Sequence, residues 1–205
     1  MHVHAEGSET ERPRPPDLST ATATRIPGEP GIWLFVAGDL IVFSAFFILI
    51  ALGQREQSAL FFQSRAQLDL GAGLFNTLLL LTGSWCVALG VQRCSSAVAG
   101  TGRRFFSLGI LCGLGFVVNK GLEWKAKFAQ GISPKTNEFF MYYFVFTGIH
   151  LLHVLVGIGV LCMLRSLSQN SVLNARQMRT LESGATFWHL VDLLWIVLFA
   201  LLYLL

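Results

Sequence analysis

Five apolar stretches of membrane-spanning length occupy most of the chain after residue 30. A helix that crosses the hydrocarbon core of a bilayer needs about 20 mostly apolar residues. We therefore predict an all-α, polytopic membrane protein, folded as a bundle of five transmembrane helices. The predicted helices cover about residues 31–52, 71–92, 103–124, 139–164 and 182–204, with short polar loops between them.

The composition agrees with a single membrane domain over residues 30–205. Of the 205 residues, 53% are apolar and only 13% are charged, whereas soluble domains carry about 25% charged residues. Five spans and their loops leave no length for a soluble catalytic domain. Residues 1–29 are rich in Pro, Ser and Thr, which predicts a disordered tail. The basic residues are scattered, so the sequence implies no nucleic-acid partner.

The distribution of positive charge predicts the orientation in the membrane. Cytoplasmic loops of membrane proteins carry more Lys and Arg than the loops on the other side. The tail and the second and fourth connections hold nine such residues, and the first and third connections hold five. We therefore predict a cytoplasmic N-terminus and a C-terminus on the opposite side.

The third predicted helix is the least apolar of the five. Its unbroken apolar run, from Phe105 to Val118, is shorter than a full span, and Lys120 and Glu123 enter its last turns. This helix must therefore lean on its neighbours or let long side chains extend to the surface. For Glu123 we predict a surface ion pair with a nearby Lys, contributing under about 1 kcal/mol.

Five ionisable side chains lie well inside the predicted spans, where each costs about 2.5 to 3.5 kcal/mol on insertion scales. At 1.5 Å of rise per residue, Asp39, His189 and Asp192 lie roughly 12, 11 and 15 Å from the cytoplasmic ends of their helices. His150 and His153 lie at roughly 21 and 17 Å on an antiparallel helix. Residues three apart share a helix face. The similar depths therefore predict one buried polar network that contains all five side chains.

Four interpretations of this network remain open from the residues alone. The side chains can simply hold the helices together, since buried polar groups are normally hydrogen-bonded. His150, His153 and His189 could ligate a haem or another metal. Asp39 and Asp192 could conduct or buffer protons. The last interpretation, a small-solute transporter, has little support because the chain shows no internal repeat and no paired broken helices.

Five sequence blocks in these spans follow one another in a specific order. They are Gly31 to Phe35 with Gly38 and Asp39; Asn76 and Thr77 to Leu81; Lys120 to Trp124 with Glu123; Phe139 to Gly157 with Thr147, Gly148, His150 and His153; and Trp188 and His189 with Asp192 and Trp195. Together they resemble subunit III of haem-copper oxidases, the cytochrome c oxidase subunit III family, in its short five-helix branch. The resemblance spans roughly residues 30–205.

The resemblance implies a non-catalytic accessory subunit with no haem or metal of its own. Its expected partner is a haem-copper catalytic subunit that holds those metals, in the inner (plasma) membrane of a bacterium, with the C-terminus periplasmic. Bound membrane lipid is a further expectation, because family members are associated with assembly, lipid binding and proton uptake.

Within the family, the blocks look most like the nitric oxide reductase accessory branch, NorE, which implies a role in denitrification. Subunit III of an aerobic cytochrome c or quinol oxidase is the alternative. Many oxidase members carry Glu where this chain has Asp39.

Overall fold

The computed structural model describes residues 28–95, 101–169 and 173–205. Five of its helices are long and apolar enough to cross a membrane, which confirms the predicted all-α bundle. Most of the predicted tail, residues 1–27, lies outside the described residues. The elements are α1 (Pro30–Glu56), α2 (Ser58–Arg65), α3 (Leu70–Ser95), α4 (Thr101–Ala129), α5 (Glu138–Leu167), α6 (Ala175–Phe199) and a closing π-helical segment, η1 (Ala200–Leu204).

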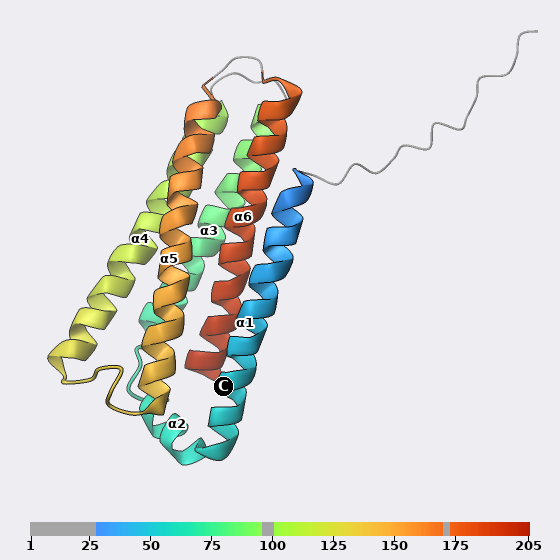
Figure 1. Ribbon diagram of the computed structural model, residues 1–205. Helices are drawn as coiled ribbons and strands as arrows, with labels where there is room; N and C mark the ends of the chain where they lie inside the picture. The colour runs from blue at the N-terminus through green and yellow to red at the C-terminus, as the bar shows by residue number, and fades with distance from the viewer. Residues whose placement is uncertain (1–27, 96–100, 170–172) are drawn as a thin grey trace, which may run out of the picture.

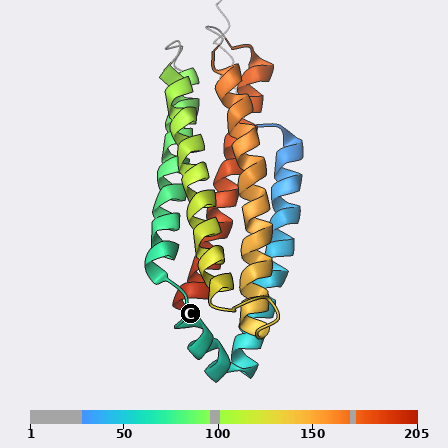
Figure 2. The same ribbon diagram turned by 90° about the vertical axis from the view of Figure 1, so that its left-hand side faces the viewer.

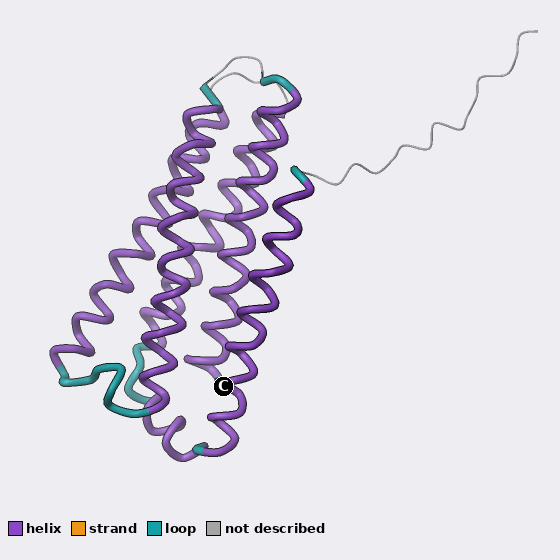
Figure 3. The backbone as a smooth tube through the Cα atoms, viewed as in Figure 1, coloured by secondary structure: helices purple, strands orange, loops and turns teal. Residues whose placement is uncertain are grey.

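The long helices run alternately up and down the bundle (Figures 1 and 2). Four of them close a ring, because α3 packs on α4, α4 on α5, α5 on α6 and α6 on α3. The first helix, α1, lies outside this ring against α6 and α5. The α1–α2 and α4–α5 connections lie at the same end of the bundle, near the end of η1 (Figure 3). We call this the α2 end.

The central helix of the bundle is α6. In its most apolar window 61% of the residues are buried, against 11% in α1. Trp188 of α6 packs directly on glycines of α4 and α5, since a Cβ added to Gly113 or Gly157 would lie 2.9 Å from its ring. Small residues that allow such close approach are a main source of helix packing in membranes. In α1, by contrast, a Cβ on Gly38 would meet no atom within 4 Å.

Local side-chain chemistry fixes several helix ends. Asn137 caps α5 by accepting a hydrogen bond from the Phe140 N–H, and Asn174 and Gln177 form a capping box at the start of α6. After α4 the chain turns at Gly131, whose φ of +77° is a left-handed conformation that favours glycine. Because of its capping box, α6 begins ahead of the start predicted near residue 182.

The polar loop predicted between the first two spans contains a short helix, α2, instead. Its eight residues are too few to cross a bilayer, which takes about 20. The Phe61 ring packs against the Phe139 ring of α5, with centroids 5.4 Å apart, whereas Phe62 is 74% exposed. This helix therefore covers the α2 end of the bundle with one face and leaves the other face open.

At the opposite end of the bundle, main-chain N–H groups just before α1 donate hydrogen bonds to side chains of α6. The Gly28 N–H donates to Glu182 Oε2 over 2.8 Å, and the Glu29 N–H donates to Ser183 Oγ over 2.9 Å. These bonds join residues that are 154 positions apart in the sequence. They hold α1 in place where its own side chains bury little surface.

Candidate functional site

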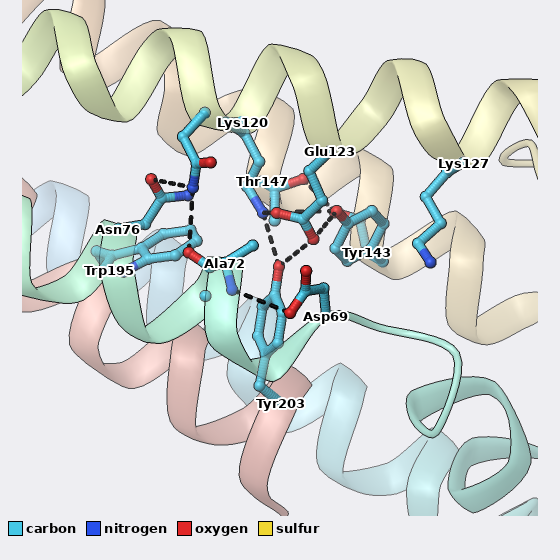
Figure 4. A network of polar contacts seen from close by, with 12 residues as sticks. Asp69, Ala72, Asn76, Lys120, Glu123, Lys127, Tyr143, Thr147, Trp195 and Tyr203 are labelled. Carbon is cyan, nitrogen blue, oxygen red and sulfur yellow. Dashed lines mark hydrogen bonds and ion pairs between the residues drawn. The ribbon is translucent and has the colours of Figure 1, made fainter.

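Four ionisable side chains meet between α4, α5 and η1, toward the α2 end (Figure 4). Lys120 is fully buried, Glu123 is 7% exposed, and Lys120 Nζ lies 3.0 Å from Glu123 Oε2. The hydroxyls of Tyr143 and Tyr203 donate to Glu123 Oε1 over 2.6 and 2.5 Å. Lys120 also donates to the Tyr203 hydroxyl over 2.8 Å. We call these four residues the end cluster.

Aromatic rings complete the surroundings of the Lys120 ammonium. Its nitrogen lies 5.0 Å from the ring centroids of Tyr143 and Trp195 and 5.3 Å from that of Tyr203. A cation over an aromatic face is stabilised by about 2 kcal/mol when both are desolvated. The carboxylate, the two phenols and the rings thus replace the water that a charged amine would otherwise require.

One expectation about α4 is wrong. Glu123 does pair with a nearby Lys, Lys120, but the pair does not lie at the surface, because Glu123 is buried and bonded to three side chains. Of the two alternatives for this helix the structure shows the first, since Lys120 turns inward against the neighbouring helices and does not extend to the surface. The reason is that α4 continues to Ala129, so both residues lie deeper than predicted. Lys127, the other candidate partner, donates to the Gln67 carbonyl oxygen instead.

Predicted motif residues beside the end cluster connect three helices. The Trp195 Nε1–H of α6 donates to Thr77 Oγ1 of α3 over 3.0 Å, and Thr77 donates to the Gly73 carbonyl oxygen over 3.0 Å. From α4, Asn119 Nδ2 donates to Asn76 Oδ1 of α3 over 2.9 Å. The polar side chains that these bonds satisfy would be costly to leave unpaired in lipid. Their arrangement fixes α3 against α4 and α6.

On α5, the motif residues Thr147 and Gly148 have packing positions. The buried Thr147 hydroxyl donates to the Tyr143 carbonyl oxygen of its own helix over 2.6 Å. A Cβ on Gly148 would lie 3.4 Å from the Trp124 ring of α4. Gly148 therefore allows α5 to lie close to α4 next to the end cluster, whereas the Thr147 hydroxyl is satisfied within α5.

The five side chains predicted to form one network are Asp39, His150, His153, His189 and Asp192, which we call the central groups. Asp39 of α1 and His153 of α5 form a pair, with 3.3 Å between Oδ1 and Nε2. The Nδ1 of His153 lies 2.9 Å from the Ile149 carbonyl oxygen and must carry a proton, because a carbonyl only accepts. The Asp39 and His153 side chains are 12% and 20% exposed, so the pair lies at the edge of the bundle.

His189 and Asp192 of α6 belong to a second site. His189 Nδ1 lies 2.5 Å from Ser84 Oγ of α3, and the Asp192 carboxyl lies beside the same serine. Asp192 is 6% exposed, and its Oδ1 has no hydrogen-bond partner within the described residues. The two polar side chains that the spacing had placed on one face of α6 therefore both face the same serine of α3.

His150 stands apart from both pairs. It is fully buried between the rings of Phe116 and Trp195, with centroid distances of 5.6 and 5.3 Å. Neither ring nitrogen has a hydrogen-bond partner in the described part of the chain. The expectation of one network is corrected to three separate sites. Similar depth does not bring the side chains together, because His150 faces α4 and α6 while His153 faces α1.

Over residues 28–95, 101–169 and 173–205, no group of three or more His, Cys, Asp and Glu side chains is placed to hold a metal ion. The three histidines considered as haem or metal ligands point to three different neighbours. These are Ser84 for His189, Asp39 for His153, and two aromatic rings for His150. The geometry therefore gives the metal interpretation no support.

Comparison with known proteins identifies the family. The profile described as cytochrome c oxidase subunit III matches residues 22–205. The chain belongs to the cytochrome c oxidase subunit III family. Its relatives include a probable cytochrome c oxidase subunit 3 from Nocardia farcinica, 25% identical over 172 residues that cover 84% of each chain.

Two other relatives of this subunit III have different names. A cytochrome bo(3) ubiquinol oxidase subunit 3 from Buchnera aphidicola is 27% identical, over 85% of this chain and 92% of its own length. A haem-copper oxidase subunit I+III from Aeropyrum pernix is 28% identical, over 84% of this chain and 22% of its own length. The family assignment agrees with the resemblance in the five sequence blocks, whereas neither relative carries the narrower link to nitric oxide reduction.

Three residues of these sites were absent from the predicted set, namely Tyr143, Tyr203 and Ser84. The two tyrosines lie near the start of α5 and the end of η1, which both approach the α2 end where α4 finishes. Their positions along the helices could therefore have predicted that both tyrosines lie near Lys120 and Glu123. Ser84 had no such signal, because a single serine in an apolar helix is common and its partner depends on helix rotation.

Proposed function

We propose that the chain is subunit III of a respiratory haem-copper oxidase, a non-catalytic subunit of a complex whose haem and copper lie in the catalytic subunit. The family match over residues 22–205 is the observation that carries this proposal. The relatives named as subunit 3 of cytochrome c or ubiquinol oxidases align over most of their own lengths.

The proposed partner is the catalytic subunit I. The Aeropyrum pernix relative is named as a subunit I+III, and this chain aligns with 22% of it. A single chain that carries both subunits supports close association of the two in separate-chain complexes. By the positive-inside rule we place the α2 end on the periplasmic side of the bacterial inner membrane, because the Arg residues beside the described starts of α4 and α6 lie at the other end.

The nitric oxide reductase accessory branch, NorE, is the second candidate. The residue Asp39 favours this candidate, because many oxidase members carry Glu at this position. The shorter acid reaches one methylene less far, but it still contacts His153. The five sequence blocks resemble this branch most, whereas the named relatives are subunits of oxidases, so the identity of the partner distinguishes the two candidates.

A pull-down in mild detergent tests the proposal. A tagged chain is extracted from its native membrane, and the proteins that travel with it are identified. Recovery of a copper-containing oxidase core is the expected result, whereas recovery of a nitric oxide reductase core would transfer the chain to the second candidate. An optical spectrum of the purified chain provides the second readout. A stoichiometric Soret band that shifts on reduction would overturn the non-catalytic role.

For the central groups we propose that they brace the bundle beside this partner. The Asp39–His153 pair lies at the bundle edge, where α1 contributes little buried surface, and it can exchange a proton between a carboxyl and an imidazole. This geometry supports a proton-buffering role for the pair. Loss of pairing in Asp39→Asn with unchanged proton uptake by the complex would restrict the pair to a structural role.

A further inference from the structure

The end cluster places two phenol hydroxyls on one carboxylate oxygen (Figure 4). Tyr143 and Tyr203 donate to Glu123 Oε1 over 2.6 and 2.5 Å, which are the short distances of bonds between a hydroxyl and an ionised acceptor. A phenol differs from the other hydroxyl side chains because its ring can lose one electron. The cluster therefore combines two oxidisable rings with a base that already holds their protons in hydrogen bonds.

The Glu123 carboxylate is positioned to take a proton during such an oxidation. Loss of an electron makes a phenol a strong acid, so oxidation is easy only where a base takes the proton at the same time. Glu123 faces the Lys120 ammonium with Oε2, 3.0 Å away, and the Tyr143 hydroxyl with Oε1. The proton can therefore move along an existing hydrogen bond, and no side chain has to be rearranged.

The two phenols differ at their oxygen atoms. Lys120 Nζ donates to the Tyr203 hydroxyl over 2.8 Å but lies 3.5 Å from the hydroxyl of Tyr143. A donor on the phenol oxygen holds its lone-pair electrons and makes the ring harder to oxidise. The ammonium lies at similar distances from the two ring centroids, 5.0 Å for Tyr143 and 5.3 Å for Tyr203, so the difference comes from the oxygens. Tyr143 is therefore the easier phenol to oxidise.

Burial protects a radical at this position. Tyr143 is fully buried and Tyr203 is 6% exposed, and the Phe144 ring lies 5.0 Å from the Tyr143 ring between centroids. Phenoxyl radicals in solution disappear by coupling with one another, which an enclosed ring cannot do. An electron, by contrast, can pass through packed protein without direct contact. Tyr142, the third tyrosine of the sequence, also donates to a carboxylate, that of Glu138, but is only partly buried.

A polar pocket beside Glu123 offers the proton a way out. Its volume is about 310 Å³, and it lies between the start of α3 and the later turns of α4, where Asp69, Lys127 and Gln130 also line it. Asp69 and Gln130 are exposed, so the pocket is open to the solution at the α2 end. Loss of an electron alone would leave the cluster with a net positive charge, which is costly in a buried site. Release of the proton from Glu123 into the pocket restores the carboxylate opposite Lys120.

We propose that the end cluster is a redox site, at which Tyr143 gives one electron to an oxygen-derived radical and its hydroxyl proton to Glu123. The Tyr143 O–H bond breaks, a neutral phenoxyl radical remains, and the proton passes from Glu123 to water in the pocket. A peroxyl radical, which forms when membrane acyl chains react with O₂, gains the electron and a proton from water and becomes a hydroperoxide. The site thus converts a reactive radical into an enclosed one. This role is separate from the proposed function and does not depend on which catalytic subunit the chain accompanies.

Radical formation in the whole purified chain tests the proposal. In detergent micelles, flash photolysis of ruthenium(II) tris-bipyridine with persulfate generates a strong one-electron oxidant, and electron paramagnetic resonance detects tyrosyl radicals. The unchanged chain is expected to give a tyrosyl signal that outlasts the signal of free tyrosine, and Tyr143→Phe is expected to lose it. Tyr142→Phe is the matched control, because its hydroxyl also bonds a carboxylate, and it should keep the signal. Tyr203→Phe should keep it too.

Two further measurements use the unchanged chain. The signal should form more slowly in D₂O than in H₂O, because the proton moves with the electron. Peroxyl radicals released by a thermal azo initiator should produce the same signal as the ruthenium oxidant.

Several results would overturn the proposal. The first is a tyrosyl signal of the unchanged chain that decays as fast as that of free tyrosine, or one that survives in Tyr143→Phe, with both chains folded by circular dichroism. Loss of the signal in Tyr142→Phe or Tyr203→Phe would overturn the assignment to Tyr143. Equal rates in the two solvents would overturn proton transfer to Glu123, and no signal with peroxyl radicals would overturn the choice of oxidant.

Discussion

The end cluster and the central groups differ in how completely this chain satisfies their polar atoms. In the end cluster, the ammonium, the carboxylate and both phenols contact one another. Among the central groups, one oxygen each of Asp39 and Asp192 and both nitrogens of His150 are buried without a partner in the described chain. A lipid interior offers no water to replace such partners. The end cluster is therefore complete within one chain, whereas the central region depends on water or a second protein.

The largest expected effect comes from breaking the end cluster. Glu123→Gln removes the carboxylate and leaves the Lys120 ammonium buried without a counter-charge. A broken buried ion pair costs about 3–5 kcal/mol, so the free energy of unfolding in detergent micelles should fall by that order. Denaturant titration followed by circular dichroism measures it. A loss under about 1 kcal/mol would show that Lys120 finds another acceptor.

A double variant separates charge from packing in the same cluster. Lys120→Met with Glu123→Leu removes both charges and keeps apolar volume, which is often neutral or stabilising for a buried pair. We expect the double variant to be more stable than Glu123→Gln in the same titration. If it is equally unstable, the two tyrosines rather than the ion pair determine the stability of the cluster.

A smaller effect is expected at the edge of the bundle. The Asp39→Asn and His153→Gln variants should show a coupling energy of about 1 kcal/mol in a double-mutant cycle, because the two side chains touch. Asp39 with His189 is the matched control, since these residues belong to separate sites and their effects should add. Additivity for both cycles would mean that the Asp39–His153 contact contributes nothing to stability.

Ser84→Ala should have an effect of about 1 kcal/mol, the typical contribution of one neutral hydrogen bond. It removes the hydroxyl that His189 contacts on the neighbouring helix. Ser166→Ala is the control, because that exposed hydroxyl bonds only the Cys162 carbonyl oxygen of its own helix. Thermal unfolding of both variants makes the comparison, and equal midpoints would remove Ser84 from the helix contact.

The smallest effect is expected for His150→Leu in the isolated chain. Replacing a buried polar group that has no partner by an apolar one of similar size is nearly neutral or stabilising. The unfolding free energy should change by under about 1 kcal/mol. The same variant in the intact complex provides the contrast, because a loss there alone would mean that the partner subunit or its water satisfies the imidazole.

From the sequence, the fold could be predicted more accurately than the contacts between side chains, and the reason is physical. Apolar length alone identifies a span, so five helices could be predicted directly. Which side chains meet depends on the rotation of each helix about its axis, and helices that are apolar on every side carry little periodic signal. His150 and His153 lie at similar depths in the membrane, which predicted that they share one network. Their side chains nevertheless point to different helices, since His150 contacts α4 and His153 contacts α1. The short helix α2 was missed because its eight residues read as polar loop.

The π-helical segment η1 makes the end of the protein sensitive to length. A π turn holds more residues than an α turn, and this wider winding carries the Tyr203 phenol to Glu123. Removing one residue from η1 would present Leu204 to the carboxylate in place of the phenol. Single-residue deletions there should thus be more harmful than most single substitutions, since they replace a proton donor with an aliphatic side chain.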